Sequence, residues 1–149
     1  MKLLMALSLT CLSFLSLNWQ TDFNKAKEDA SKQNKAILIS FSGSDWCGPC
    51  IRMEKEIFES DVFTNYATNN LVLVKADFPR EKKDQLSKEQ IQKNDALAEK
   101  YNPEGKFPLT VLVSVDEKVL KEWEGLPKET PDQFIEEIKT VFDGAGNSK

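Results

Sequence analysis

The chain folds around Phe41-Ser42-Gly43-Ser44-Asp45-Trp46-Cys47-Gly48-Pro49-Cys50. Two cysteines in this stretch are separated by Gly48 and Pro49. A near-continuous apolar run over residues 36–41 leads into it, and residues 51–58, with apolar positions at helical spacing, lead out. Because strands buried on both faces read as continuous apolar runs, the sequence predicts a dithiol where a buried strand passes into a helix.

The pattern on either side of this stretch predicts an α/β fold. Strands and helices alternate along most of the chain, which favours a central mixed β-sheet with helices on both faces and an antiparallel hairpin at its edge. We expect the tail from Gly144 to Lys149 to be frayed. The expected strands are 36–41, 71–77, 109–115 and 118–124. The expected helices are residues 21–35, a helix that begins at Cys47 and continues after Ser60, residues 87–101, and a helix that begins at Thr130.

Composition limits the classes of function that the chain can have. Its 149 residues suit one domain, and a formal net charge of −4 without a basic cluster argues against a nucleic-acid surface. Histidine is absent, which removes Cys-His and Ser-His catalysis and every histidine-containing metal site. Two cysteines alone supply half of a tetrahedral zinc shell, so a metal site would need a dimer. We also expect a monomer with no metal and no cofactor.

The N-terminal segment has the pattern of a targeting sequence. Lys2 supplies a positive start, and the apolar run Leu3 to Leu17 is short for a membrane span but suits a secretory signal peptide. We expect residues 1–20 to form the signal, with cleavage between Ser16 and Thr21, and residues 21–149 to form one periplasmic domain. Two alternatives stay open: a lipid-modified Cys11 in a lipid-anchored envelope protein, and an uncleaved anchor. Only these would bring the protein to a membrane.

The spacing of the two cysteines favours redox exchange over a structural role. A disulfide that closes so small a loop restrains the unfolded chain very little. Cys47 lies at the predicted start of a helix, where the helix dipole favours a thiolate, and Cys50 lies about one turn further in and should be more buried. We expect Cys47 to attack a substrate disulfide and form a mixed disulfide, which Cys50 then resolves by attacking Cys47.

Trp46-Cys47-Gly48-Pro49-Cys50 resembles the active-site motif of the thioredoxin family. Lys75 on the next strand and Phe107-Pro108 before the third strand also fall in thioredoxin order, and the likeness extends from about residue 21 to residue 142. The lead-in and the charged loop after residue 77 look like those of exported bacterial thioredoxin-like proteins, especially of the Bacteroidetes type. The resemblance implies a thioredoxin fold and a redox-active Cys47–Cys50 disulfide.

The resemblance also implies roles for residues outside the dithiol. Pro108 would be a cis-proline beside the cysteines, the backbone of Phe107 would pair with the substrate chain, and Trp46 would form part of the docking surface. Gly48 and Pro49 between the cysteines are typical of reducing thioredoxins. Lys75 matches the family lysine near the dithiol, although a solvated surface charge is an equal alternative.

One position departs from the family pattern. Thioredoxins carry a buried aspartate on the strand before the motif, which assists proton transfer to the inner cysteine, and Ser40 stands there in this sequence. Asp45 is expected to be an exposed loop residue that does not fill the same place. Cys50 should therefore lose its proton less readily, which leaves the rate and direction of exchange open.

These features together predict an exported thiol-disulfide oxidoreductase that reduces protein disulfides in the cell envelope. Its partners would be disulfide-containing protein substrates and an unidentified upstream redox partner. The alternative is a thioredoxin-like binding module without redox turnover, which the missing acid and the charged residues between Arg80 and Glu89 favour. In the simplest case that charged segment is a solvated loop.

Overall fold

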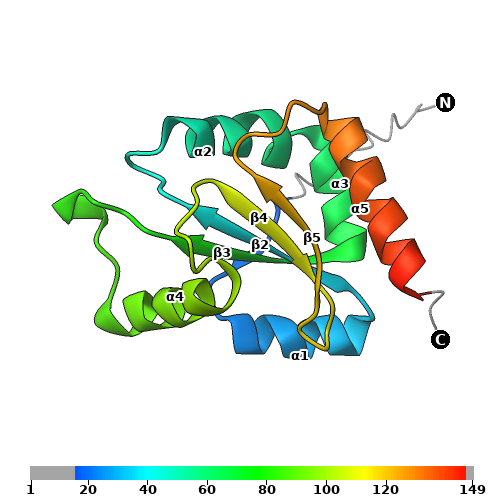
Figure 1. Cartoon of the computed structure of the whole chain (residues 1–149), viewed down its shortest axis with the longest axis horizontal. Coiled ribbons are helices and arrows are strands. Elements are labelled where there is room, and N and C mark those ends of the chain that lie inside the picture. The colour runs from blue at the N-terminus through cyan, green and yellow to red at the C-terminus, as the bar shows by residue number, and fades with distance from the viewer. Residues whose placement is uncertain (1–15, 147–149) are drawn as a thin grey trace, which may run out of the picture.

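Five strands form one mixed sheet in the computed structural model, which describes residues 16–146. The strand order is β1-β3-β2-β4-β5; β1 and β2 each pair with β3 in parallel, while β4 runs antiparallel to β2 and β5 antiparallel to β4 (Figure 1). The predicted mixed sheet with a terminal hairpin is confirmed. The strands are β1 (Trp19–Gln20), β2 (Ala36–Ser42), β3 (Leu71–Asp77), β4 (Leu109–Val113) and β5 (Val119–Glu124).

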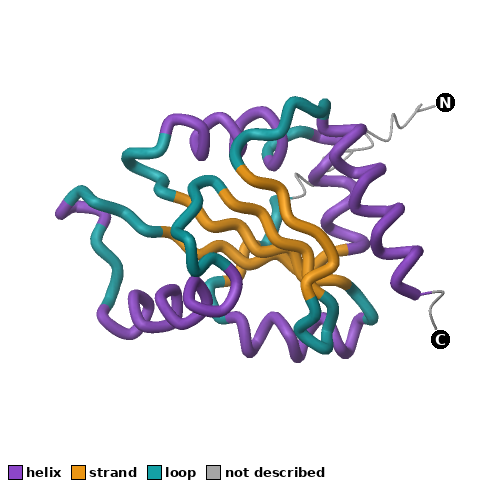
Figure 2. Tube along the Cα trace, viewed as in Figure 1, coloured by secondary structure: helices purple, strands orange, loops and turns teal. Residues whose placement is uncertain are grey.

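Helices cover both faces of this sheet, as predicted (Figure 2). One face carries α2, η1, α3 and α5, and the other carries α1 and α4. None of the helices in the described part of the chain is long and apolar enough to cross a membrane. The helices are α1 (Phe23–Gln33), α2 (Gly48–Met53), the π-helix η1 (Glu54–Phe58), α3 (Asp61–Asn70), the short 3-10 helix η2 (Lys82–Asp84), α4 (Lys88–Tyr101) and α5 (Pro131–Gly146).

The central strand β2 supplies both halves of the core, because side chains alternate between the two faces of a strand. Every residue of β2 is buried. Leu38 packs in the cluster under α3 and α5, whereas Ile37 and Ile39 pack in the cluster over α1 and α4. The continuous apolar run that precedes the two cysteines is therefore the strand with helices on either side.

Side-chain caps fix where four helices begin, as the sequence predicts. Asp22, Ser60 and Ser87 each accept a hydrogen bond from the backbone N–H three residues later, at 3.1 to 3.2 Å. Thr130 and Gln133 form a complete capping box, with bonds of 3.0 and 3.3 Å in the two directions. These local bonds explain why the helix starts could be read from sequence.

Several elements differ from the prediction, and the largest differences are in β1, β4 and α5. Strand β1 is absent from the prediction, because residues 19–20 fall in the expected signal segment and two residues are too few to show a pattern; Trp19 pairs with Leu73 at the edge of the sheet. Strand β4 ends at Val113 because a turn follows it. Helix α5 continues to Gly146, so the expectation of a frayed tail is wrong for residues 144–146, while residues 147–149, like residues 1–15 of the expected signal, lie outside the described residues.

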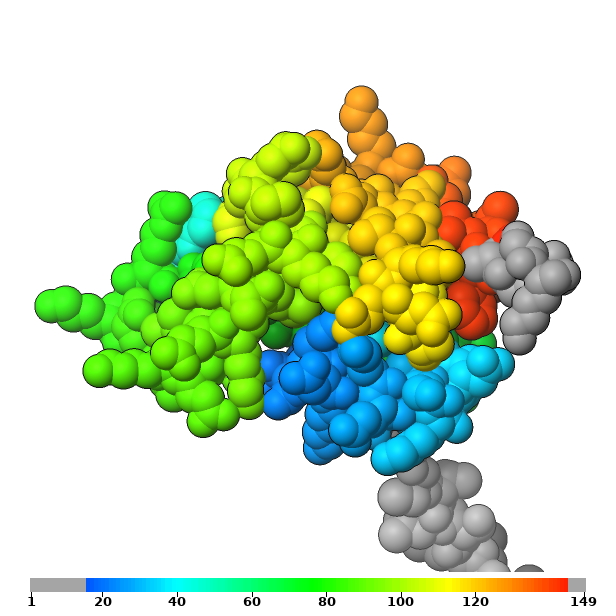
Figure 3. Space-filling model, turned by 60° about the horizontal axis from the view of Figure 1, so that its bottom comes forward, coloured from blue at the N-terminus to red at the C-terminus, as the bar shows by residue number. Residues whose placement is uncertain are grey.

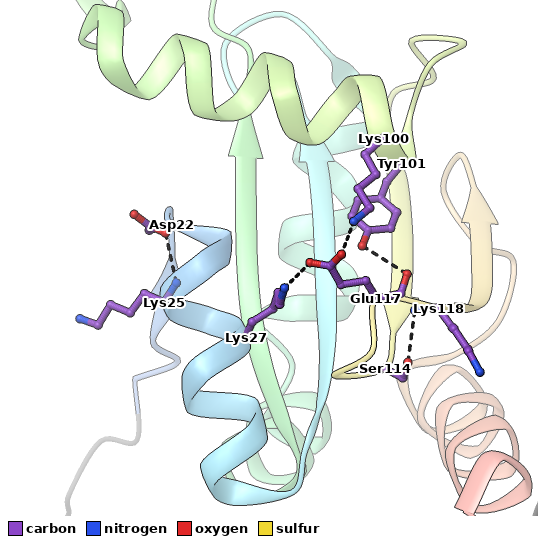
Figure 4. A network of polar contacts seen from close by, with 8 residues as sticks. All are labelled: Asp22, Lys25, Lys27, Lys100, Tyr101, Ser114, Glu117 and Lys118. Carbon is purple, nitrogen blue, oxygen red and sulfur yellow. Dashed lines mark hydrogen bonds and ion pairs between the residues drawn. The ribbon is translucent and has the colours of Figure 1, made fainter.

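The turn between β4 and β5 is held to both helices on its side of the sheet. Glu117 has a φ of 64° in this turn, and its carboxylate lies between Lys27 of α1 and Lys100 of α4 (Figure 4). The hydroxyl of Tyr101 donates to the Glu117 carbonyl at 3.4 Å. In the space-filling view α1, the end of α4 and this turn meet on one face (Figure 3). The ion pairs with Lys100 and then Lys27 lower the pKa of Glu117.

Replacing Glu117 with glutamine should therefore lower the free energy of unfolding by about 1 kcal/mol at pH 7. A carboxyl whose pKa is lowered by folding stabilises the fold above its unfolded pKa, and the contribution is lost as pH falls through the folded value. Urea titrations at pH 7 and pH 3 would measure the loss at pH 7 and its disappearance at pH 3. Glu122→Gln, an exposed change on β5, is the control. Equal losses at both pH values would contradict the prediction.

Candidate active site

Strand directions bring four connections to one end of the sheet. Parallel strands β2 and β3 end there, so the loop before α2 and the loop before α4 leave the sheet side by side (Figure 1). Strand β4 begins there, and β5, antiparallel to β4, ends there, with Leu109 opposite Glu124. The topology thus places the two cysteines, the start of the charged loop, and Phe107-Pro108 at one edge of the molecule.

Cys47 and Cys50 form a disulfide at the start of α2. Their Cα atoms are 5.2 Å apart, and the Cys47 sulfur accepts a hydrogen bond of 3.2 Å from the Cys50 N–H. Cys47 is therefore the N-cap of the helix, and its sulfur lies at the helix N-terminus, where this N–H donor and the helix dipole favour negative charge. Both residues are buried, Cys47 being 5% exposed and Cys50 3%, so the expected difference in burial is small.

An open cleft of about 730 Å³ is lined by Pro49, the residue before Cys50. Pro49 and Arg52 of α2 form one wall, Phe107 and Pro108 another, and the connection 125–131 after β5 closes it. The peptide bond between Phe107 and Pro108 is cis, as expected. Because the cleft is open and of this size, it has room for a segment of another polypeptide.

Trp46 is fixed from several sides. Its indole N–H donates to the Phe78 carbonyl at 2.7 Å, and its ring meets the ring of Phe107 edge-on, with centroids 5.5 Å apart. The ring also lies against Gly43, where an added Cβ would come within 2.3 Å of it, so glycine is needed at that position. The Arg80 guanidinium covers the ring at 3.7 Å from its centroid. The face of the Trp46 ring that Arg80 covers is therefore not open to solvent, and the exposed group at this place is Arg80.

A second, smaller cavity of about 230 Å³ lies behind Cys50. Glu54 of η1 and Lys75 of β3 both line it, and their side chains form an ion pair of 2.7 Å. The Lys75 ammonium also lies 4.9 Å from the centre of the Trp19 ring in β1. Cys50 thus shares a cavity with a carboxylate that Lys75 holds in place.

Ser40 lies on β2 at the position where the family has its buried proton-transfer aspartate. Ser40 is 3% exposed in β2, opposite Lys75 of β3. Asp45 is not the exposed loop residue that we expected, because it is half-buried and accepts hydrogen bonds of 2.6 to 3.0 Å from the N–H groups of Arg80 and Glu81. Desolvation raises the pKa of Asp45, but these hydrogen bonds outweigh it and leave the pKa below its usual value.

Comparison with known protein families identifies this arrangement. The sequence model of a family described as thioredoxin-like matches residues 18–113. The chain belongs to the thioredoxin-like family. Its mixed sheet, with helices on both faces and the disulfide at the start of α2, is a thioredoxin fold.

Relatives of this thioredoxin-like chain include two proteins of Chlamydia pneumoniae. It is 36% identical over 105 residues to the disulfide bond reductase DsbH and 31% identical over 104 residues to the thioredoxin-related protein DsbJ. The alignments cover 70% and 69% of this chain, but only 61% and 29% of those relatives. A solved structure of a DsbH oxidoreductase matches with 30% identity and a TM-score of 0.78, over 86% of this chain and 85% of that one.

Most of the residues predicted for the thioredoxin-like site lie together. Cys47 is bonded to Cys50, the preceding residue Trp46 contacts Phe107, and Lys75 reaches the cavity behind Cys50 rather than standing alone in solvent. Gly48 is exposed, and an added Cβ there would meet nothing within 4 Å, so nothing in the structure explains a glycine at that position.

Sequence reasoning missed Glu54, and it named Arg80 only as the start of a charged segment. Glu54 could have been found, because it stands four residues after Cys50 and so shares its helix face. Arg80 carries no comparable signal. It comes from a loop far along the chain and reaches Trp46 only through the tertiary fold.

Proposed function

We propose that this protein is a thiol-disulfide oxidoreductase that reduces disulfides in polypeptide partners. The observation that carries the proposal is the Cys47–Cys50 disulfide at the start of α2, next to a cleft lined by Phe107 and Pro108. The reductase named among the relatives supports the reducing direction. An upstream partner, not identified by these features, would return the Cys47–Cys50 disulfide to the dithiol after each turnover.

The proposed reaction has two exchange steps. The Cys47 thiolate attacks one sulfur of the partner's disulfide; a mixed disulfide forms and the partner's other sulfur leaves as a thiolate. Cys50 then loses its proton and attacks the Cys47 sulfur, which restores the Cys47–Cys50 disulfide and releases the second partner sulfur. The partner gains two electrons and the protein loses two. The cavity behind Cys50 supports Glu54 as the acceptor of the Cys50 proton, directly or through water.

Turnover of a protein disulfide tests this function. With dithiothreitol as electron donor, catalytic amounts of the protein should accelerate the reduction of insulin, measured by precipitation of its B chain. A reduction potential of the Cys47–Cys50 pair near −270 mV would agree with a reducing role, whereas a value near −120 mV would reverse the direction. A Cys47–Cys50 disulfide that can be reduced but gives no turnover would instead support a binding module, the alternative that the missing acid at Ser40 favours.

We further propose that the protein is exported and that its signal is cleaved before Trp19. The apolar run from Leu3 supports export. The contacts of Trp19 support this position: it pairs in β1, packs against Phe58 at 5.0 Å between ring centroids, and contacts Lys75, so a mature chain that begins after Gln20 would lose these contacts. The intact mass of the mature protein from an envelope fraction checks this; a chain beginning at Thr21 would contradict it.

The expected likeness to proteins of the Bacteroidetes type and the expected monomer stay predictions. A lipid-anchored protein also stays an alternative, since Cys11 lies outside the described residues.

A further inference from the structure

We propose that Arg80 selects partners in which an acidic side chain stands close to the cysteine under attack. The inference rests on the proposed function and adds a substrate preference to it. It is carried by the way the loop between β3 and α4, residues 78–87, is attached to the loop that bears the cysteines.

The two loops are joined by side chain-to-backbone hydrogen bonds. The Asp77 carboxylate accepts from the N–H of Ser44 at 2.9 Å and from its hydroxyl. In return, Asp45 accepts from two N–H groups of the other loop, and Trp46 donates to one of its carbonyls. In Figure 3 the connection before α2, in cyan, lies against the connection after β3, in green. The start of the charged loop is thus an ordered part of the active-site edge.

This attachment places the Arg80 guanidinium over the Trp46 ring, at 3.7 Å from its centroid, beside the cysteine that follows. Arg80 is exposed, and within residues 16–146 its guanidinium has no carboxylate partner. Two nearby cations differ in this respect, since Lys83 pairs with Glu81 and Arg52 pairs with Glu56. Arg80 is therefore a cation whose position is fixed by stacking and whose N–H groups remain available.

Phe107 connects the cleft with the ring on which this cation is stacked. Phe107 lines the cleft, and its ring contacts both Trp46 and Phe78, with centroids 5.5 and 5.4 Å apart. A polypeptide segment that follows the cleft past Phe107 would reach the edge at which Trp46 carries Arg80. A side chain close to the partner's cysteine would then meet the guanidinium.

Guanidinium and carboxylate groups match in shape as well as in charge. Arginine presents a planar fork of N–H donors that can bind both oxygens of a carboxylate, and it stacks on aromatic rings without losing those donors. Stacking on Trp46 already restricts the side chain, so less conformational entropy is lost when a partner binds. Aspartate or glutamate beside the partner's cysteine is therefore the favoured feature, and lysine there is disfavoured.

The test compares disulfide-bonded peptides that differ only in the residue next to the reactive cysteine: aspartate, serine or lysine. Single-turnover reduction by the dithiol form should be about fivefold more efficient for the aspartate peptide than for the serine peptide, which corresponds to one exposed ion pair of about 1 kcal/mol. Arg80→Gln should remove the preference, Arg80→Glu should reverse it toward lysine, and 0.5 M salt should weaken it.

Lys82→Gln is the matched control, because Lys82 lies exposed in the same loop and is not stacked on Trp46. It should keep the preference of the parent protein, and the serine peptide should react at similar rates with all the variants. Reduction of all three peptides at equal rates by the parent protein would overturn this inference and leave the proposed function intact. Failure to reduce any of them would overturn the proposed function, and this inference with it.

Discussion

Cys47→Ser should lower insulin reduction by at least about 1,000-fold, to the rate of dithiothreitol alone, because it removes the nucleophile on which every later step depends. Serine has nearly the same size, but its hydroxyl is not ionised at neutral pH and does not exchange with disulfides. The fold should survive the change, since the disulfide closes a loop too short to contribute much stability. The assay is B-chain precipitation, with the thermal unfolding of each variant measured in parallel.

Cys50→Ser is the matched variant, and it should behave differently. It should also lose turnover, but Cys47 should still attack, so that mixed disulfides with partner proteins accumulate and are visible by mass spectrometry under non-reducing conditions. If instead Cys47→Ser captured partners and Cys50→Ser did not, the two cysteines would have exchanged roles. Full activity in Cys47→Ser would rule out the proposed function.

Glu54→Gln should slow the second exchange step by about 100-fold at neutral pH, since a positioned base typically contributes a factor of this size. Glu54 lines the cavity behind Cys50 and is held by Lys75 at 2.7 Å. The variant keeps the shape of the side chain but does not accept a proton. Stopped-flow release of a fluorescent partner from the mixed disulfide isolates this step. The defect should shrink as pH rises, because hydroxide then takes over from the missing carboxylate.

The same cavity provides the control for Glu54. Its other charged residues are Lys55, Glu59 and Lys75, and of these Glu59 is an exposed acid. Glu59→Gln should leave the second step within about twofold of the parent rate, as expected for an exposed surface charge. The first step, attack by Cys47, should be unchanged in both variants. Equal defects in the two variants, or none in Glu54→Gln, would contradict a proton-accepting role for Glu54.

Much of the fold could be predicted because its signals are local. The run 36–41 shows by itself that it is buried on both faces, and caps such as Ser60 and Thr130 bond within three residues of themselves. Strand β1 could not be predicted in the same way. Two residues carry no periodicity, and Trp19 becomes part of the sheet only because the distant strand β3 offers it an edge.

The sequence alone determined where the two cysteines lie: Cys47 and Cys50 stand at the start of a helix after a buried strand. This could be predicted because the strand, the helix start and the cysteine spacing all depend on neighbours in the chain. The tertiary structure decided what surrounds the two cysteines. Lys75 forms an ion pair with Glu54 behind Cys50. Asp45 accepts a hydrogen bond from the Arg80 N–H, and the Arg80 side chain stacks on Trp46. These contacts join residues 21 to 36 positions apart, so no local pattern contains them; they exist because parallel strands β2 and β3 end at the same edge.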